Sequence, residues 1–121
     1  MPEVNPRDLE VLQKKVVAFR DARDWKQFHS PKDVAISLVL EAGELLEHFQ
    51  WKNAEETATH VKNKKEEVSD EVADVLYWIL LIANDLEIDL PSALDKKLKK
   101  NSAKYPVNKA KGRHNKYTDY Q

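Results

Sequence analysis

Two segments that are apolar almost all the way round a helix constrain the fold of this chain most strongly. One runs from Val34 to Leu46 and carries only two charges, and the other runs from Val75 to Asn84 and carries none. A helix that is apolar on nearly all sides must be buried on most of them. A chain of 121 residues has few other helices to cover both segments, so we expect oligomerisation through them. The alternative is a tight monomeric bundle.

Prolines divide the rest of the sequence into further helices. Pro6, Pro31 and Pro91 stand where a helix can begin, and Pro106 stands where one must end. Only two glycines are present, which argues against tight hairpins and a β-sheet. We therefore predict an all-α fold in a single domain over residues 1–121. The predicted helices cover residues 6–24, 31–51, 60–86 and 91–105, and an extended tail follows over 107–121.

Several classes of protein are excluded by what the sequence lacks. Without cysteine, the chain has no disulfide framework, no thiolate metal site and no cysteine nucleophile. Residues Met1–Asn5 contain neither a basic nor an apolar region, so we expect no signal peptide. The longest uncharged run, Val75–Asn84, has 10 residues, whereas a membrane span needs about 20. These features predict a cytoplasmic protein without a membrane partner.

Two pairs of carboxylates lie in or beside the apolar segments. Glu41 and Glu44 are three residues apart inside the first segment, and Glu71 and Asp74 repeat this spacing at the entrance to the second. Residues three apart share a helix face, and an isolated carboxylate buried there is strongly unfavourable. If the two helices pack antiparallel, the pairs face each other and repel, and a divalent cation between them removes the conflict.

The choice of metal follows from the ligand atoms. All the proposed ligands are oxygen, which suits Mg²⁺, Mn²⁺ or Ca²⁺. A ferritin-like di-iron site needs Glu three residues before a histidine, and no histidine of this chain has one. An EF-hand loop for Ca²⁺ is also absent from the sequence. Two alternatives stay open: the pairs are ordinary solvated helix charges, or Glu67 and Asp70, which have the same spacing, join the site.

The C-terminal part of the chain is strongly basic. Between Lys96 and Lys116 there are nine Lys or Arg residues and no Asp or Glu, whereas acidic residues concentrate upstream. This division suggests a polyanion that is held through a metal on one side and by lysines on the other. A solvated basic tail is the other interpretation.

Three motifs follow one another at separations typical of one family. They are EAGELLEHFQW from Glu41 to Trp51, EVADVL from Glu71 to Leu76, and KYPV from Lys104 to Val107. Together they resemble the MazG-type nucleotide pyrophosphohydrolases, in particular their small single-domain dCTP pyrophosphatase branch, over residues 16–118. The resemblance implies a MazG-like, all-α four-helix bundle completed by oligomerisation, as a dimer or a dimer of dimers.

The resemblance also implies an activity. It is Mg²⁺-dependent hydrolysis of a nucleoside triphosphate to the monophosphate and pyrophosphate, with Mn²⁺ as a substitute metal and house-cleaning of the nucleotide pool as the role. The expected substrate is dCTP or a related or modified dNTP. A carboxylate not needed by the metal, among Glu41, Glu44 and Glu67, would accept the proton of the attacking water. By motif match, the catalytic metal ligands are Glu41, Glu44, Glu71 and Asp74.

Substrate-binding residues come from the same resemblance. The segment from Asp24 to His29 matches the family's segment before its second helix. Four aromatic or imidazole rings would lie at the base and sugar: Trp25, His29, Trp51 and Trp78. Four residues of the fourth helix and its end would lie near the phosphates: Lys97, Asn101, Lys104 and Tyr105. The dCTP pyrophosphatase branch has Tyr where this chain has Trp78, which leaves the base preference open.

A non-catalytic interaction protein is the alternative function. In the basic C-terminal segment, Tyr105, Tyr117 and Tyr120 are interleaved with lysines, a pattern compatible with nucleic-acid binding. A binding module of this kind gains nothing from carboxylates such as Glu41 and Glu44 in an apolar segment. We therefore expect a nucleotide, and not a nucleic acid, as the partner.

Overall fold

All the regular secondary structure in residues 6–120, which are those that the structure, a computed structural model, describes, is helical. This confirms the all-α prediction. Met1–Asn5 and Gln121, which belong to the predicted domain and its tail, lie outside the described residues. The chain forms two compact units, of which the first ends at Glu87 and the second begins at Ile88. The prediction of a single domain stays a prediction. No described helix is both long and apolar enough to cross a membrane.

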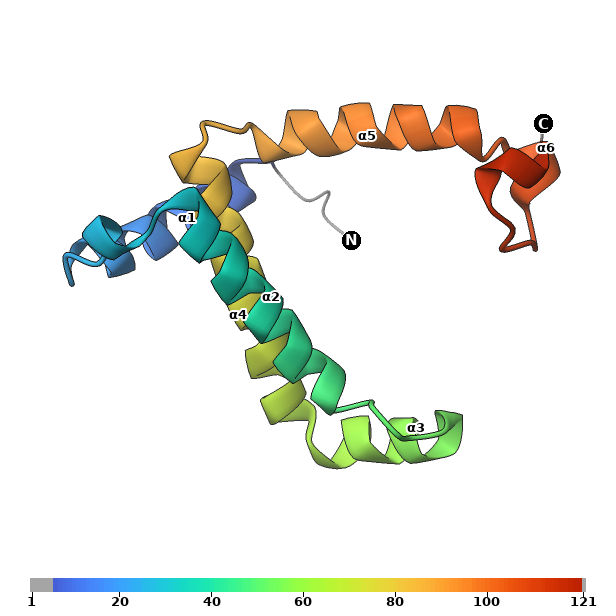
Figure 1. Cartoon of the computed structure of the whole chain (residues 1–121), viewed down its shortest axis with the longest axis horizontal. Helices are drawn as coiled ribbons and strands as arrows, with labels where there is room; N and C mark the ends of the chain where they lie inside the picture. Colours follow the sequence, from blue (N-terminus) through green and yellow to red (C-terminus); the bar gives the residue numbers. More distant parts are fainter. Residues whose placement is uncertain (1–5, 121) are drawn as a thin grey trace. The chain divides into compact units, whose positions relative to one another are not determined.

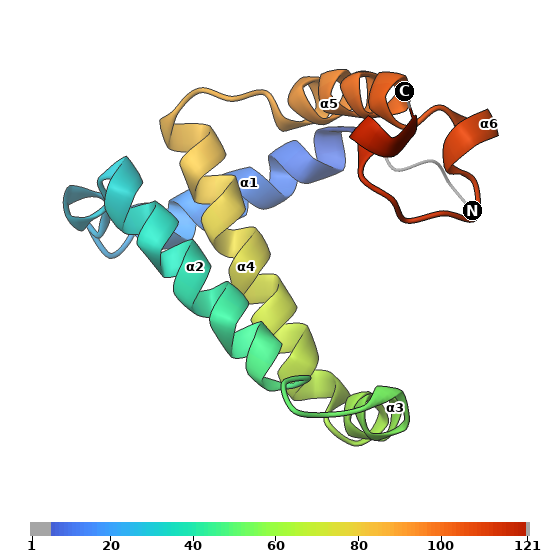
Figure 2. The ribbon, with the colours of Figure 1, turned by 45° about the vertical axis from the view of Figure 1, so that its right-hand side comes forward.

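The first unit is built around two long antiparallel helices. Helices α2 and α4 lie side by side along most of their length, and α1 packs across the C-terminal part of α4 (Figures 1 and 2). A short helix, α3, connects α2 to α4, and a 3-10 turn, η1, precedes α2. The elements are α1 (Pro6–Asp21), η1 (Lys26–Phe28), α2 (Pro31–Glu47), α3 (Ala54–Asn63) and α4 (Lys65–Asp85).

Local capping chemistry sets the start of α2. Ser30 is its N-cap, with an extended backbone and a hydroxyl that accepts the Asp33 N–H at 3.2 Å. Pro31 follows at the first helical position, where its fixed φ suits a helix and its missing N–H costs nothing. Removing an N-cap hydroxyl typically costs about 1 kcal/mol of stability. The predicted start of this helix at residue 31 is therefore confirmed.

Two helices end earlier than their periodicity predicts. The first ends at Asp21 and not at residue 24, because Asp24 has the left-handed φ of +53° and the chain turns there. The second ends at Glu47 and not at residue 51, because a turn follows in which Trp51 has φ of +67°. Apolar spacing continues through both turns, so periodicity alone does not reveal them.

The predicted helix over 60–86 is in fact two helices. Asn53 and Glu56 form a capping box at the start of α3, most of which lies between the predicted helices over 31–51 and 60–86. The chain then breaks at Lys64, with φ of −122° and ψ of 31°, before α4 begins. The imidazoles of His48 and His60, 2.8 Å apart between Nδ1 and Nε2, join the end of α2 to α3.

The buried core of the first unit is small. It consists of Val34 from α2 and Leu80, Leu81 and Ala83 from α4, together with the fully buried Arg20. Large apolar side chains of the central helices remain exposed, by 39 to 68%: Ile36, Val39, Leu40, Leu46, Val72 and Leu76. So much uncovered apolar surface is what the predicted oligomerisation requires, and the oligomer itself stays a prediction.

The second unit contains α5 (Leu90–Lys104), α6 (Val107–Ala110) and the 3-10 turn η2 (Tyr117–Tyr120). The Asp89 carboxylate caps α5 by accepting the Ser92 N–H at 3.2 Å. The prediction of an extended tail is wrong, because this part of the chain forms α6 and η2, and Tyr117 and Tyr120 of η2 pack against Tyr105. Tyr120 is 6% exposed, its ring meets that of Tyr105 edge to face at 5.9 Å, and its carbonyl accepts a hydrogen bond from Lys109 Nζ.

Candidate active site

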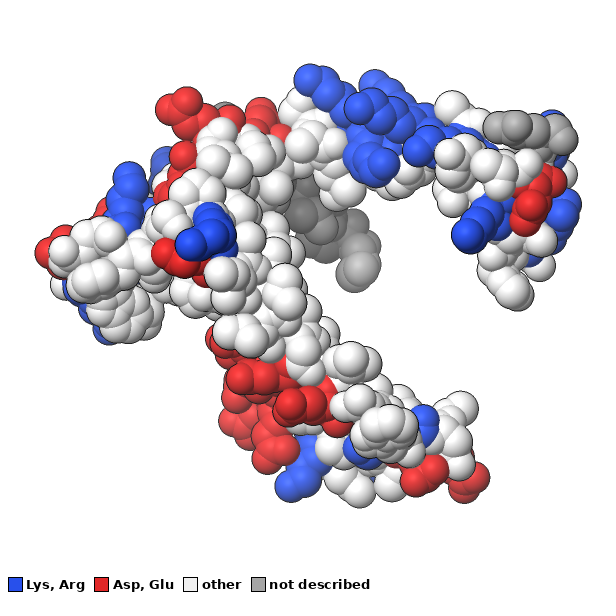
Figure 3. All heavy atoms as spheres, in the orientation of Figure 1, with Lys and Arg blue, Asp and Glu red and all other residues white. Residues whose placement is uncertain are grey.

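The antiparallel pairing of α2 and α4 brings three carboxylates together. One carboxylate oxygen from each of Glu41, Glu44 and Glu71 lies within 4.8 Å of the others. We call these three residues the acidic triad. Figure 3 shows Asp and Glu side chains gathered along the lower part of the α2–α4 pair, while Lys and Arg side chains line α5. Divalent cations with oxygen ligands bind to groups of this kind.

Two oxygens of the triad lack a partner. Oε2 of Glu41 and Oε2 of Glu71 are buried and accept no hydrogen bond. Burial, and then the neighbouring Glu44, raise the pKa of Glu41 to about 7. The same two causes raise the pKa of Glu71. Buried acceptors without donors are costly, and a divalent cation would satisfy both, so the residues present fit such a group.

The other acidic residues that the sequence indicated as possible metal ligands are not members of the triad. Asp74 is on α4 and contributes to the raised pKa of Glu41 by charge repulsion, yet it is not a member of the triad. Glu67 is 60% exposed and forms an ion pair with Lys64 at 3.8 Å. Asp70 is exposed to solvent. Glu67 and Asp70 are therefore outside the cluster that the folded chain forms.

A cavity of about 470 Å³ adjoins the triad. Its wall is mostly aromatic and aliphatic and comes from α1, from the turn between α1 and α2 (residues 22–30), from α2 and from α4. Glu41 belongs both to this wall and to the triad, and Asp74 stands in the wall as well. The lining residues are Lys15, Val16, Phe19, Trp25, Glu41, Asp74, Tyr77 and Trp78. An apolar cavity of this size with a few polar groups at one end is typical of a small-molecule site.

Five rings follow one another edge to face, and the first four of them line the cavity. Their centroids are separated by 6.0 Å between Trp25 and Phe19, and by 6.1 Å between Phe19 and Tyr77. The series continues over 5.0 Å from Tyr77 to Trp78, and over 5.3 Å from Trp78 to His29. Burial, and then the charge of Arg20, lower the pKa of His29, so its ring is neutral at pH 7. Its buried Nδ1 has no hydrogen-bond partner.

Four lining residues were not among the predicted site residues: Lys15, Val16, Phe19 and Tyr77. Phe19 lies at helical spacing from Val16, a pattern that indicates an ordinary core position. Tyr77 precedes Trp78 in the uncharged segment of α4, where an aromatic residue also predicts only burial. Only the approach of α1 to α4 shows that these side chains line a cavity.

Trp51, like His29, is a predicted ring of this unit that does not line the cavity. It is 92% exposed and follows the turn that ends α2. The predicted helix over 31–51 extended as far as Trp51, which would have kept this ring in line with the helix. A place for Trp51 at the base stays a prediction.

The residues predicted near the phosphates all belong to the second unit. The Lys104 ammonium lies 4.9 Å from the centre of the Tyr117 ring, and the Tyr105 ring meets Tyr117 edge to face at 6.3 Å. The Asn101 carbonyl accepts the Tyr105 N–H at 2.8 Å, and Lys97 is exposed on α5. Their contact with a substrate stays a prediction.

Comparison with known proteins identifies relatives over most of the chain. Rat dCTP pyrophosphatase 1 is 38% identical over 113 residues, and the human protein of the same name is 35% identical over 113 residues. Both matches cover 92% of this chain but 66% of the relative, so this chain spans just under two thirds of their length. The crystal structure of a pyrophosphatase from Archaeoglobus fulgidus is 39% identical, with a TM-score of 0.78, over 82% of this chain and 93% of that one.

The family model fits the same region. The MazG-like family matches residues 36–120, a range that includes the acidic triad, Asp74 and the whole of α5. The match, the sequence identity to the relatives and the similarity to the archaeal structure confirm the resemblance noted from the three motifs. This chain belongs to the MazG-like family.

Proposed function

We propose that this protein is a nucleotide pyrophosphohydrolase that converts a nucleoside triphosphate to the monophosphate and pyrophosphate. The observation that carries the proposal is that Glu41 belongs at once to the acidic triad and to the aromatic cavity. A cation held by the triad would neutralise phosphate charge beside a cavity whose rings suit a base. The names of the relatives, dCTP pyrophosphatase and pyrophosphatase, support the same activity, with dCTP or a related or modified dNTP as substrate.

Mg²⁺ is the proposed metal, with Mn²⁺ as a substitute. Glu41, Glu44 and Glu71 would hold it, with Asp74 as a further ligand at the cavity wall. A bound divalent cation lowers the pKa of a coordinated water and offsets the charge of the triphosphate. Of the triad, Glu44 is the exposed member and is best placed to accept a proton from water at its carboxylate.

The cavity is proposed to bind the base. Stacking of a base on an aromatic ring is worth about 1–3 kcal/mol in single-strand binding proteins, and Trp25 and Trp78 offer their rings to the cavity. Neutral His29, in contact with Trp78, stands next to the place where the sugar would lie. Lys97 and Lys104 are proposed to contact the departing pyrophosphate. We further propose a cytoplasmic homo-oligomer with a house-cleaning role for the nucleotide pool.

The activity can be tested directly. Each dNTP, together with modified dNTPs, is incubated with the protein and Mg²⁺, and the products are separated by ion-exchange chromatography. The proposal predicts deoxynucleoside monophosphate and pyrophosphate in equal amounts, fastest for dCTP or a derivative of it. Release of a deoxynucleoside diphosphate and inorganic phosphate would show that a different bond is cleaved, and would overturn the proposed reaction.

The affinity for a divalent cation is expected to decrease as the pH is lowered. The pKa of Glu41 is raised to about 7, so below that pH a proton competes with the cation for this carboxylate. Mn²⁺ binding, followed by electron paramagnetic resonance without nucleotide, should weaken by up to about tenfold per pH unit below 7. The variant E41Q should bind Mn²⁺ more weakly and with a flatter pH dependence. Equal affinity at pH 8 and pH 6 would contradict this assignment.

Removal of the Trp25 ring is expected to weaken nucleotide binding more than turnover. The ring is part of the cavity wall, and the loss of one stacking contact is worth about 1–3 kcal/mol, so Trp25→Ala should raise KM about tenfold. Phe28→Ala is the matched control, because Phe28 belongs to the same turn but is 66% exposed and does not line the cavity. A similar KM for both variants would show that the base binds elsewhere.

A further inference from the structure

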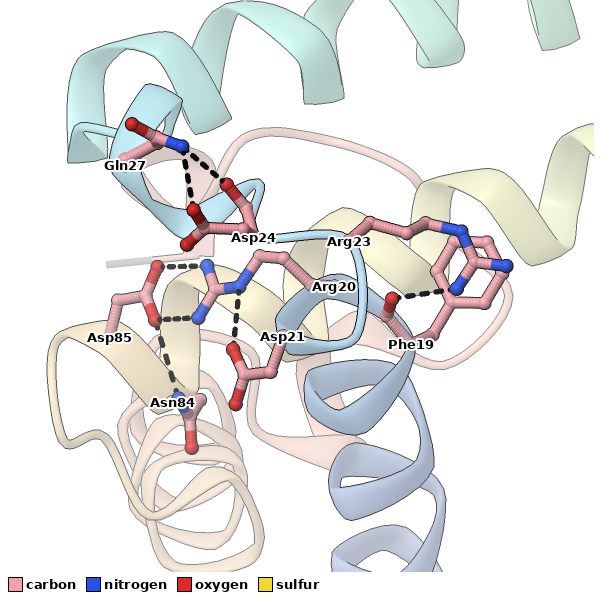
Figure 4. A network of polar contacts seen from close by, with 8 residues as sticks. All are labelled: Phe19, Arg20, Asp21, Arg23, Asp24, Gln27, Asn84 and Asp85. Carbon is pink, nitrogen blue, oxygen red and sulfur yellow. Dashed lines mark hydrogen bonds and ion pairs between the residues drawn. The ribbon is translucent and has the colours of Figure 1, made fainter.

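The fully buried arginine of α1 forms a forked ion pair with the end of α4. Nη1 and Nη2 of Arg20 each donate a hydrogen bond to one oxygen of Asp85, both at 2.7 Å, as Figure 4 shows. The Arg20 side chain is 0% exposed and that of Asp85 is 10% exposed. Asn84 donates a further hydrogen bond to Asp85. A buried ion pair is seldom more stabilising than apolar residues of the same volume, so its value here must lie in the geometry that it imposes.

The same arginine also holds the turn that follows α1. Its backbone carbonyl accepts the N–H of Arg23 at 3.1 Å and the N–H of Trp25 at 3.2 Å. Within the turn, Gln27 donates from its amide to the carbonyl and the carboxylate of Asp24 (Figure 4). These bonds shape the turn but none of them ties it to α4. Among the described residues, Arg20 is the one whose hydrogen bonds reach both the turn, through its carbonyl, and α4, through its guanidinium.

Few other polar contacts fix α1 against α4. Among the described residues, the other hydrogen bond between these helices runs from the Gln13 amide to the Leu80 carbonyl, at 3.0 Å. Gln13 lies about two helical turns before Arg20. Of these two contacts between α1 and α4, the Arg20–Asp85 pair is thus the one that lies next to the turn.

The position of this turn determines where the first and the last ring of the series lie. Trp25 begins the series and His29 ends it, and both follow Arg20 in the connection to α2. Phe19, Tyr77 and Trp78 between them belong to the helices. A shift of the turn relative to α4 would move Trp25 and His29 away from these rings, while the acidic triad, on α2 and α4, would stay in place.

We propose that Arg20 and Asp85 are positioning residues that hold the turn against the end of α4 and so keep Trp25 in place for the nucleotide base and His29 in place for its sugar. This inference rests on the proposed function in taking the cavity as the base site. Neither residue lines the cavity or belongs to the triad. Their loss should therefore affect recognition of the nucleotide and leave the metal site intact.

The test uses two conservative variants and one matched control. Asp85→Asn keeps the shape of the side chain and removes its charge, and Arg20→Lys keeps the charge and removes the fork. Gln13→Met removes the other hydrogen bond between α1 and α4, far from the turn. If the single variants fold poorly, the double variant Arg20→Met with Asp85→Leu is used instead. It replaces the ion pair by apolar side chains, which destabilises a protein less than leaving one charge of a buried pair without its partner.

The measurements separate positioning from simple loss of stability. In the Arg20 and Asp85 variants, KM for dCTP and the Kd for dCMP, from tryptophan fluorescence, should rise about tenfold. Their kcat should stay within about threefold, Mn²⁺ affinity should be unchanged, and the near-ultraviolet circular dichroism of the tryptophans should change. Gln13→Met, compared at a temperature of equal folded fraction, should change none of these quantities.

The failure of this inference differs from failure of the proposed function. Unchanged KM, dCMP affinity and tryptophan dichroism in folded Arg20 and Asp85 variants would overturn the positioning role, as would the same changes in Gln13→Met. A wild-type protein that binds dCMP without hydrolysing any dNTP would overturn the proposed activity alone, and the dCMP affinities would still decide the inference. If the wild type binds no nucleotide, the base site is wrong and the inference is overturned with it.

Discussion

Replacing Glu41 with glutamine is expected to lower kcat by at least about 100-fold and, at the same time, to stabilise the metal-free protein. Glu41 is shared by the acidic triad and the cavity, so its charge acts where the cation and the phosphates would meet. The amide has almost the same shape but no charge to hold a cation. Steady-state kinetics with Mg²⁺ and dCTP measure the first effect, and thermal unfolding in the presence of a chelator measures the second.

The gain in stability should depend on pH in a defined direction. The pKa of Glu41 is raised from an ordinary 4.5 to about 7 in the folded protein, so the folded state binds the proton more tightly than the unfolded state does. Ionised Glu41 therefore destabilises the fold above pH 7, and this cost disappears as the pH falls towards 4.5. We expect E41Q to exceed the wild type by roughly 1–2 kcal/mol in free energy of unfolding at pH 8, and by little at pH 5.

Glu67→Gln is the matched control for Glu41→Gln. Glu67 also belongs to the acidic part of the helix pair, but it is 60% exposed and its ion pair is with Lys64 at the surface. Its replacement should leave kcat, Mn²⁺ affinity and the pH dependence of stability nearly unchanged, since exposed ion pairs contribute only about 0–1 kcal/mol. Equal losses of activity in the two variants would show that the motif pairs were assigned to the wrong carboxylates.

A negative charge at Val39 is expected to dissociate the oligomer. Val39 is 68% exposed and, with Ile36 and Leu40, lines an apolar groove of about 320 Å³ on α2. We propose that a second copy covers this surface, because monomeric proteins seldom leave such a patch open. A carboxylate buried there without a partner would cost several kcal/mol, so Val39→Asp should raise the Kd of association by at least about 100-fold.

Sedimentation velocity over a range of protein concentrations measures this effect. The wild type is expected to sediment as a dimer or a dimer of dimers, and Val39→Asp as a monomer. Val39 is two residues from Glu41 and does not line its cavity, so the substitution tests assembly with little direct effect on the site. Val107→Asp is the control, because Val107 is also apolar and 75% exposed but lies on α6. A monomeric wild type at micromolar concentration would contradict the proposed assembly.

The all-helical fold could be predicted because its signals are local. A proline at the first position and a serine before it mark the start of α2 without reference to any other part of the chain. Helix ends were harder to predict, since the turns at Asp24 and Trp51 interrupt apolar spacing that continues beyond them. The capping box at Asn53 was a local signal as well, and it would have revealed α3.

Which side chains of the candidate site share a helix face follows from the sequence alone. A spacing of three residues places Glu41 with Glu44 on any α-helix, whatever surrounds it. The apolar residues around Glu41 also indicate that this carboxylate needs a partner. Both conclusions depend only on the geometry of one helix and on the cost of burying a charge.

Which carboxylates meet, and which residues lie beside them, depends on how the helices pack. Packing of Val34, Leu80 and Leu81 sets the rotation and the axial position of α2 against α4, and no spacing within one helix contains these two quantities. That packing joins Glu71, and not Asp74, to the pair on α2. The ion pair of Arg20 with Asp85, residues 65 positions apart in sequence, likewise exists only because α1 crosses α4. The triad and its cavity are therefore properties of how the helices pack.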